Sequence, residues 1–271
     1  MMDFSVLMSV YDAEEPEYLS LALDSVLDQT SRPNEIVLVE DGPLTAALDA
    51  VVSRYAAEHP GLFKIIRISE NVGLGRALNQ GLQECSREIV FRMDTDDVCY
   101  PERFQKQIEF LEMHPEITVL GTSIQEFDQH PGDLGRYRDL PTSGETLLTF
   151  AKYRNPLNHP TVAFRKAHIL EVGSYQDLPL FEDYFLWARV IQAGYTIHNM
   201  EEPLLHFRVG NDMVGRRHGL SYGRKEYAFL QRLKKIGFLS SSEFMMSLLV
   251  KTPLRLLPKS MLSLLYKKFL R

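Results

Sequence analysis

The sequence predicts an α/β protein in which strands and helices alternate to build a largely parallel sheet. Three observations support this prediction. Short runs of β-branched and aromatic residues recur through the first 120 residues, and apolar residues at helical spacing separate them. The 271 residues are enough to bury a large core without disulfides or metals. The hydrophobic share of 45% and the charged share of 24% are those of an ordinary globular protein.

The first half of the chain contains the clearest elements. Four strands are predicted, over residues 4–10, 35–39, 63–68 and 88–93. Apolar residues at helical spacing predict one helix through residues 19–27 and another through residues 44–55. We expect a third helix after Gly75 and a fourth after Pro101, because proline suits the first turn of a helix.

The second half is less regular. Beyond residue 122, prolines and glycines interrupt the pattern and predict longer loops with mixed strands. A strand is expected at residues 161–165, and a helix at residues 184–193 that Gly194 ends. From Arg217 onward the chain is expected to be helical and basic.

The net charge of −6 combines an acidic body with a basic tail. Residues 1–215 carry a charge of −17, whereas residues 216–271 carry +11. We therefore expect a main domain over 1–215, with halves at 1–120 and 121–215, followed by a tail. A basic tail favours an anionic, extended partner, either a membrane surface or a nucleic acid.

Compartment signals are few. The two cysteines, Cys85 and Cys99, cannot form a disulfide framework, and the first residues lack the features of a secretory signal. No uninterrupted apolar stretch reaches the roughly 18 residues that a membrane-spanning helix needs. The expectation is a protein of the reducing cytosol.

An acidic run follows the fourth predicted strand. Asp94, Asp96 and Asp97 lie just past its end, where ligand sites form in open α/β sheets. Crowded carboxylates repel one another unless a cation or a proton lies among them. If the chain stays extended, Asp94 and Asp96 point to the same side and suit one hard cation such as Mg²⁺ or Mn²⁺. Taken alone, the run is equally consistent with a solvated acidic turn.

Other polar residues follow neighbouring strands. Ser9 and Tyr11 follow the first strand, and Asp41 follows the second. These residues are expected at the same edge of the sheet as the acidic run. Asp41-Gly42 also suits an ordinary turn. The glycines of segment 71–75 would let the backbone approach a diphosphate at a helix N-terminus, or they form only a tight loop.

Five motifs in order resemble the family 2 glycosyltransferases, which have the GT-A fold. They are FSVLMSVYDAEEPEYLSLALDSVLDQT, EIVLVEDG, NVGLGRALNQGL, DTDD followed by YPERF, and FEDYFLWARVIQAG. The resemblance covers residues 3–210. It is greatest to bacterial enzymes that build O-antigen or exopolysaccharide repeat units. It implies a mixed, Rossmann-like nucleotide-binding sheet flanked by helices, with the basic helical tail as an extension.

The resemblance also implies roles for residues of this chain. The nucleotide-sugar would be held by Ser9, Tyr11, Asp41, Arg76, Asp94 and Arg208. Asp96, together with Asp94, would bind the Mn²⁺ or Mg²⁺ that bridges the donor diphosphate. Arg216 and Arg217 are alternatives to Arg208 for covering the diphosphate. A third metal ligand, His206 or His218, stays open.

The same resemblance implies the reaction. The acidic pair Glu182 and Asp183 would supply the base, with Asp183 preferred, and direct displacement with a single base inverts the anomeric centre. Without the family match, Asp183 would be interpreted as an acid stabilised by the helix dipole.

The partners follow from that reaction. The expected donor is a UDP-sugar, and the expected acceptor is a hydroxyl of a glycan or of a polyprenyl-linked saccharide. The amphipathic tail favours peripheral attachment to the anionic inner face of the cell membrane, the alternative being a helix packed on the domain.

Two other functions fit parts of the sequence. Asp94-Thr95-Asp96-Asp97-Val98 also matches the nucleophile motif of haloacid-dehalogenase-like phosphatases, but 90 residues with nucleotide-site features precede it. A nucleic-acid-binding role for the tail is opposed by the acidic body, which would repel phosphates, so no nucleic acid is expected.

Overall fold

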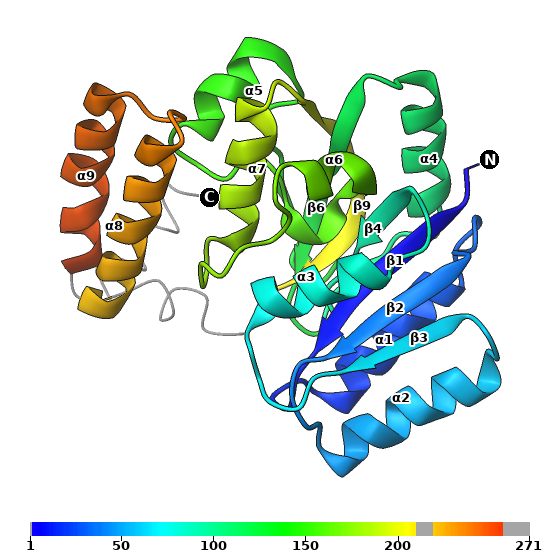
Figure 1. Ribbon diagram of the computed structural model, residues 1–271. Coiled ribbons are helices and arrows are strands. Elements are labelled where there is room, and N and C mark those ends of the chain that lie inside the picture. The colour runs from blue at the N-terminus through cyan, green and yellow to red at the C-terminus, as the bar shows by residue number, and fades with distance from the viewer. Residues whose placement is uncertain (1, 210–218, 257–271) are drawn as a thin grey trace.

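The computed structural model describes residues 2–209 and 219–256, with side chains as far as Lys251. A nine-stranded sheet forms its centre, and helices cover both faces (Figure 1). The strands are β1 Phe4–Val10, β2 Glu35–Glu40, β3 Phe63–Arg67, β4 Ile89–Arg92, β5 Val98–Cys99, β6 Ile117–Phe127, β7 Arg136–Arg138, β8 Ala163–Arg165 and β9 Thr196–Arg208. The helices are α1 Pro16–Leu27, α2 Ala46–Glu58, α3 Leu74–Glu84, α4 Arg103–Met113, α5 Gly144–Ala151, α6 Lys166–Glu171, α7 Glu182–Gln192, α8 Gly219–Lys235 and α9 Ser241–Leu256.

The first four strands form the parallel half of the sheet. The order across the sheet is β3-β2-β1-β4-β8-β6-β9-β5, with β7 paired to β6. Leu7 of β1 lies beside Arg92 of β4, and Val10 lies beside Glu40 of β2. The carboxyl ends of β1, β2 and β4 therefore meet at one edge, as the sequence predicted.

The mixed half departs from the prediction in two places. β6 has eleven residues, all buried, and runs without a break past residue 122, where the sequence predicted longer loops with mixed strands. It pairs in parallel with β9 and antiparallel with β8. The strand predicted at 161–165 is confirmed only over Ala163–Arg165, because Pro160 lies in a 3-10 turn at His159–Thr161 that precedes it.

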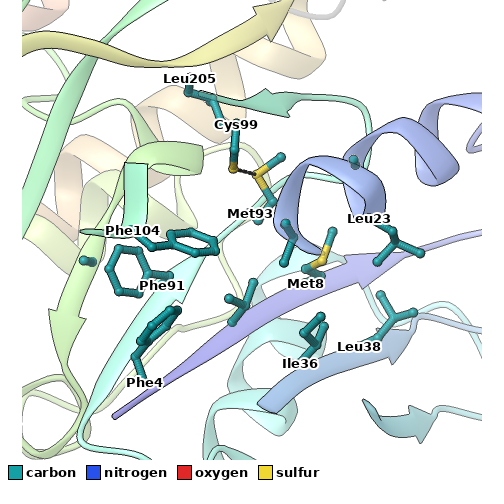
Figure 2. Close-up of a cluster of buried hydrophobic side chains, with 14 of the residues drawn as sticks. Phe4, Met8, Leu23, Ile36, Leu38, Phe91, Met93, Cys99, Phe104 and Leu205 are labelled. Carbon is teal, nitrogen blue, oxygen red and sulfur yellow. Dashed lines mark hydrogen bonds between the residues drawn. The ribbon is translucent and has the colours of Figure 1, made fainter. Parts of the chain in front are cut away.

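Two apolar clusters sandwich the sheet. One joins the strands to α1, α2 and α4, and the other joins them to α3, α6 and α7. Figure 2 shows the first cluster, where Phe4, Phe91 and Phe104 pack with ring centroids 4.7–5.2 Å apart. Because side chains alternate along a strand, Val90 and Arg92 lie on the opposite face from Phe91.

The C-terminal helices pack on the domain through a third cluster. Phe181 and Tyr184 at the start of α7 contact Phe229 of α8, with ring centroids 4.5 and 4.8 Å apart. Phe244 of α9 belongs to the same cluster. In Figure 1 α9 lies beside α8, and α8 lies between α9 and α7. The packed alternative for the tail thus holds for α8, while residues 216–218 and 257–271 of the predicted tail lie outside the described residues.

One face of α9 remains apolar and exposed. Its exposed residues are Met245, Met246, Leu249 and Val250. Among the helices that the structure describes, none is long and apolar enough to span a bilayer.

Candidate active site

A cavity of about 720 Å³ opens at the carboxyl edge of the parallel strands. Seven of the sequence-predicted site residues line it, namely Ser9, Tyr11, Asp41, Asp94, Asp96, Glu182 and Arg208. Arg76 and Asp183 are not among its lining residues. A second cavity, of about 480 Å³ between α1 and α2, is lined by none of the predicted site residues. The first cavity is therefore the candidate active site.

The acidic run after β4 forms a compact cluster. One carboxylate oxygen from each of Asp94, Asp96 and Asp97 lies within 4.8 Å of the other two. Asp94 forms an ion pair with Arg92. One oxygen of Asp97 accepts a hydrogen bond from the backbone N–H of Arg208 at 2.8 Å, and its other oxygen is buried with no partner among the described residues.

This cluster suits a hard divalent cation. All its donors are carboxylate oxygens, which Mg²⁺ and Mn²⁺ prefer. Burial, and then the charges of Asp94 and Glu14, raise the pKa of Asp96 to about 7. Burial and the neighbouring Asp96 also raise the pKa of Asp97. A bound cation would reduce the repulsion among the three carboxylates and would give the buried oxygen of Asp97 a partner. The residues present therefore fit a metal.

Glu14 is a site residue that the sequence analysis missed. It lies in the loop after β1 and lines the cavity. The hydroxyl of Thr95 donates a hydrogen bond to Glu14 at 2.6 Å, which ties this loop to the acidic run. Burial raises the pKa of Glu14, although the bond from Thr95 opposes that rise. The only signal in the sequence was an acidic residue four positions after a strand that ends at the site.

Asp41 organises the loop that precedes α3. Its two carboxylate oxygens accept hydrogen bonds from the backbone N–H groups of Val72 at 2.7 Å and Gly73 at 3.1 Å. These two N–H groups are thus bonded to Asp41. Of the two alternatives that the sequence left open for segment 71–75, a tight loop and a backbone that approaches a diphosphate, this bonding agrees with the tight loop. Gly42 is required for the close approach, because a Cβ there would lie 2.8 Å from the Asn71 nitrogen at a φ of +90°.

Gly75 has a packing role. A Cβ at this position would lie 3.0 Å from both the Gln176 carbonyl oxygen and the Glu182 Cβ. The missing side chain lets the first turn of α3 approach α7. This contact brings Glu182 to the cavity that β1, β2 and β4 define.

Arg208, at the end of β9, forms hydrogen bonds to the acidic run. Its Nε donates to the Asp96 carbonyl at 2.9 Å, and another guanidinium nitrogen donates to the Asp128 carbonyl at 3.1 Å. The guanidinium lies over the ring of Tyr18, 3.7 Å from its centroid. Its remaining nitrogen is buried and has no partner among the described residues. Arg208 thus lines the cavity as a cation next to the carboxylates.

Arg76 lies at the surface outside the cavity lining. It forms an ion pair with Asp177 at 2.6 Å, and both side chains are at least half exposed. Asp177 itself lines the cavity. The predicted role of Arg76 beside the nucleotide stays a prediction.

The acidic pair at the start of α7 divides between two environments. Glu182 is largely buried and lines the cavity, and burial together with the charge of Asp183 raises its pKa to about 7. Asp183 points elsewhere. One of its oxygens accepts a hydrogen bond from the Asn155 side-chain amide at 2.6 Å. The pair therefore faces the donor cavity with one carboxylate and the α5–β8 loop with the other.

The histidine candidates differ in position. His206 stacks on Tyr100, with centroids 4.1 Å apart, and does not line the cavity. Burial lowers its pKa. His218, like Arg216 and Arg217, lies outside the described residues. The third metal ligand thus stays open.

A parallel half-sheet that ends in a carboxylate cluster, beside a helix that starts with a second acidic pair, is the arrangement expected of a transferase of nucleotide-activated sugars. The chain belongs to glycosyl transferase family 2, whose model matches residues 5–173. It is a glycosyltransferase, and this membership decides against the phosphatase interpretation of Asp94.

Curated relatives match almost the whole chain. The amylovoran biosynthesis glycosyltransferase AmsE of Erwinia amylovora is 42% identical over 268 residues, which cover 98% of each chain. The UDP-Gal:alpha-D-GlcNAc-diphosphoundecaprenol beta-1,3-galactosyltransferase of Escherichia coli is 33% identical over 268 residues, which cover 99% of this chain and 96% of that protein.

Solved structures establish the GT-A fold. TarS 1–349 of S. aureus, in complex with UDP-GlcNAc, superposes with a TM-score of 0.67 at 19% identity. The match covers 86% of this chain and 66% of TarS 1–349. The mannosyltransferase PcManGT of Pyrobaculum calidifontis, with GDP-Man and Mn²⁺, gives a TM-score of 0.66 at 16% identity, covering 99% and 83% of the two chains.

Proposed function

We propose that the chain is an inverting, metal-dependent glycosyltransferase of bacterial surface polysaccharide synthesis. It moves a sugar from a nucleoside diphosphate donor, a UDP-sugar, to a hydroxyl of a lipid-linked glycan. The observation that carries this proposal is the meeting of Asp94, Asp96 and Glu182 in one cavity, with Asp183 the next residue of α7. The Escherichia coli relative, whose name specifies UDP-Gal and a diphosphoundecaprenol-linked acceptor, supports the choice of substrates.

The donor side of the cavity binds the nucleotide. Ser9, Tyr11 and the Asp41-anchored loop would contact the nucleoside, and Asp94 and Asp96 would hold the divalent cation, for which Mn²⁺ is the first choice. When bound, such a cation neutralises the charge that develops on the departing diphosphate. Arg208 adds a fixed positive charge on the same side of the cavity.

The base side activates the acceptor. Asp183 takes the proton of the acceptor hydroxyl as the hydroxyl oxygen bonds to the anomeric carbon. The bond from that carbon to the diphosphate oxygen breaks, and the nucleoside diphosphate leaves with the electron pair. Attack opposite to the leaving group inverts the anomeric configuration. The hydrogen bond from Asn155 holds the Asp183 carboxylate in one orientation.

A donor screen tests this function. Thermal unfolding of the full chain is measured with UDP- and GDP-sugars, with and without Mn²⁺, because a ligand that binds the folded state raises its melting temperature. The stabilising donor is then incubated with α-D-GlcNAc-diphosphoundecaprenol, and the anomeric configuration of the product is determined. No stabilisation by any donor, or retention of configuration, would contradict the proposal.

The lipid-linked acceptor implies work at the cytoplasmic face of a membrane, and we place the contact on α9. The apolar exposed face of α9 consists of Met245, Met246, Leu249 and Val250. The neighbouring helix α8 carries basic residues in its last turn, namely Arg232, Lys234 and Lys235. Each Lys or Arg near an anionic leaflet contributes about 1 kcal/mol. The two buried free cysteines, Cys85 and Cys99, are consistent with a reducing compartment.

Vesicle flotation tests the membrane contact. The wild type is expected to float with vesicles that contain anionic lipid, and Met246→Glu combined with Leu249→Glu is expected to abolish flotation. Leu21→Glu is the matched control, since Leu21 is a comparably exposed apolar residue on α1. Equal flotation of the wild type and the α9 variant would place the contact elsewhere.

A further inference from the structure

Arg92 is a buried charge directly beneath the active site. It is the last residue of β4, its side chain is 1% exposed, and its backbone N–H donates to the Val162 carbonyl at 2.9 Å. Strand alternation turns the side chain toward α3 and α7, the face on which Glu182 lies. A buried cation is costly unless nearby groups compensate it, so the contacts of Arg92 indicate why it is there.

Within the described part of the chain, the guanidinium of Arg92 has one partner. One terminal nitrogen pairs with Asp94, while Nε and the other terminal nitrogen are buried with no partner among the described residues. Two other buried arginines differ. All three guanidinium nitrogens of Arg103 have partners, and so do those of Arg189, which bond to backbone carbonyls. The guanidinium groups of Arg103 and Arg189 thus stabilise the surrounding fold, whereas that of Arg92 pairs with Asp94, a residue of the candidate site.

Arg92 has no place in the cavity lining, so it acts through its neighbours. Burial raises the pKa of Asp96 and of Glu182, and the charge of Arg92 opposes both rises. Arg92 is thus a fixed cation whose charge acts on both Asp96 and Glu182. Without a bonded partner, the partly exposed carboxylate of Asp94 would be free to rotate away from the position that it shares with Asp96 and Asp97.

We propose that Arg92 is a positioning residue, which holds the carboxylate of Asp94 in the orientation that binds the divalent cation and the nucleotide. The inference rests on the proposed function, since it assigns Arg92 a role at the same site. Groups that hydrogen-bond to metal ligands orient them, and their removal weakens metal binding or activity by about 10- to 100-fold.

Calorimetric titration with Mn²⁺ tests the role of Arg92. The titration is performed on the full chain in the presence of UDP or GDP, whichever stabilises the wild type. Arg92→Met, which keeps the length of the side chain and removes its charge, is expected to weaken Mn²⁺ binding by about 10- to 100-fold. Arg92→Lys, which keeps a charge and one nitrogen, is expected to lie between Arg92→Met and the wild type. If Arg92→Met does not fold, Arg92→Gln replaces it with the same expectation.

Two controls separate positioning from a general structural role. Arg189→Met removes a buried arginine that does not line the cavity and that bonds to backbone carbonyls, and it is expected to lower thermal stability without changing the Kd for Mn²⁺. In an Asp94→Asn background, Arg92→Met is expected to have little further effect, because the two residues act as one unit. An unchanged Kd with a reduced bound fraction in Arg92→Met, or additive effects in the double variant, would overturn the inference.

Failure of the inference differs from failure of the proposed function. If the wild type binds Mn²⁺ and Asp96→Ala does not, but the Arg92 variants bind like the wild type, only the role of Arg92 is wrong. If the wild type binds no Mn²⁺ with either nucleotide, the metal-dependent function is wrong, and the inference is wrong with it.

Discussion

Replacing Asp183 by asparagine tests its role as the base independently of donor binding. The amide keeps an oxygen that can accept the 2.6 Å hydrogen bond from Asn155, so the fold around the start of α7 is retained. It cannot take a proton from the acceptor. General base catalysis contributes about 10²- to 10⁴-fold, so kcat is expected to fall by that factor, which corresponds to about 2.7–5.4 kcal/mol of barrier.

Donor binding is expected to survive this change. Asp183 is absent from the lining of the donor cavity, whereas its neighbour Glu182 is part of that lining. Glu182→Gln is therefore the matched variant, and it is expected to raise the donor KM more than it lowers kcat. Steady-state release of nucleoside diphosphate gives kcat and KM, and calorimetry gives the donor Kd. Transfer by Asp183→Asn at nearly the wild-type rate, or the loss of kcat in Glu182→Gln instead, would refute the assignment of the base.

Three further predictions concern loop anchoring, packing and pH. Asp41→Ala removes two hydrogen bonds to a carboxylate, each worth about 1.5–3 kcal/mol, so urea unfolding should show a loss of at least about 3 kcal/mol. Hydrogen exchange at residues 71–73 should also accelerate. Gly81→Ala places a Cβ 2.5 Å from side chains of β1 and β2 and should destabilise by about 1–3 kcal/mol, whereas Gly223→Ala, with open space around it, should stabilise. The pKa of Glu182 is raised from 4.5 to about 7, so its stabilising contribution is present below pH 4.5 and is lost as the pH rises through 7. Urea midpoints that decline equally over this range in the wild type and in Glu182→Gln would contradict the last prediction.

The parallel half of the fold could be predicted because each strand is a short apolar run of adjacent residues. β6 could not, since its later residues are polar and yet buried. Gln125 accepts a hydrogen bond from the Tyr100 hydroxyl at 2.6 Å, and Glu126 pairs with Arg138 on β7. Both partners come from other elements of the fold, Tyr100 from the segment after β5 and Arg138 from β7. Tertiary structure brings them to β6, and no local sequence pattern indicates these pairs.

The candidate site was predictable where its residues directly follow strands. Asp94 and Asp96 were found in this way, and the register of β1 against β4 places them beside Ser9. Glu14 was missed because the loop after β1 must fold back before its carboxylate reaches Thr95. Neighbouring residues of a helix point about 100° apart, so Glu182 and Asp183 were bound to diverge. Which of the two faces the cavity depends on the approach of α3 to α7 at Gly75, which sequence spacing does not reveal.

The central claim is that the acids at the carboxyl edge of the sheet hold a divalent cation for the donor diphosphate. Calorimetric titration of the stabilising nucleotide-sugar, with and without Mn²⁺, tests it most directly on the wild type and on Asp96→Ala. The wild type is expected to bind the donor tightly only with Mn²⁺, and Asp96→Ala is expected to lose this dependence while remaining folded. Equal donor affinity with and without Mn²⁺ in the wild type, or unchanged Mn²⁺-dependent binding in Asp96→Ala, would contradict the claim.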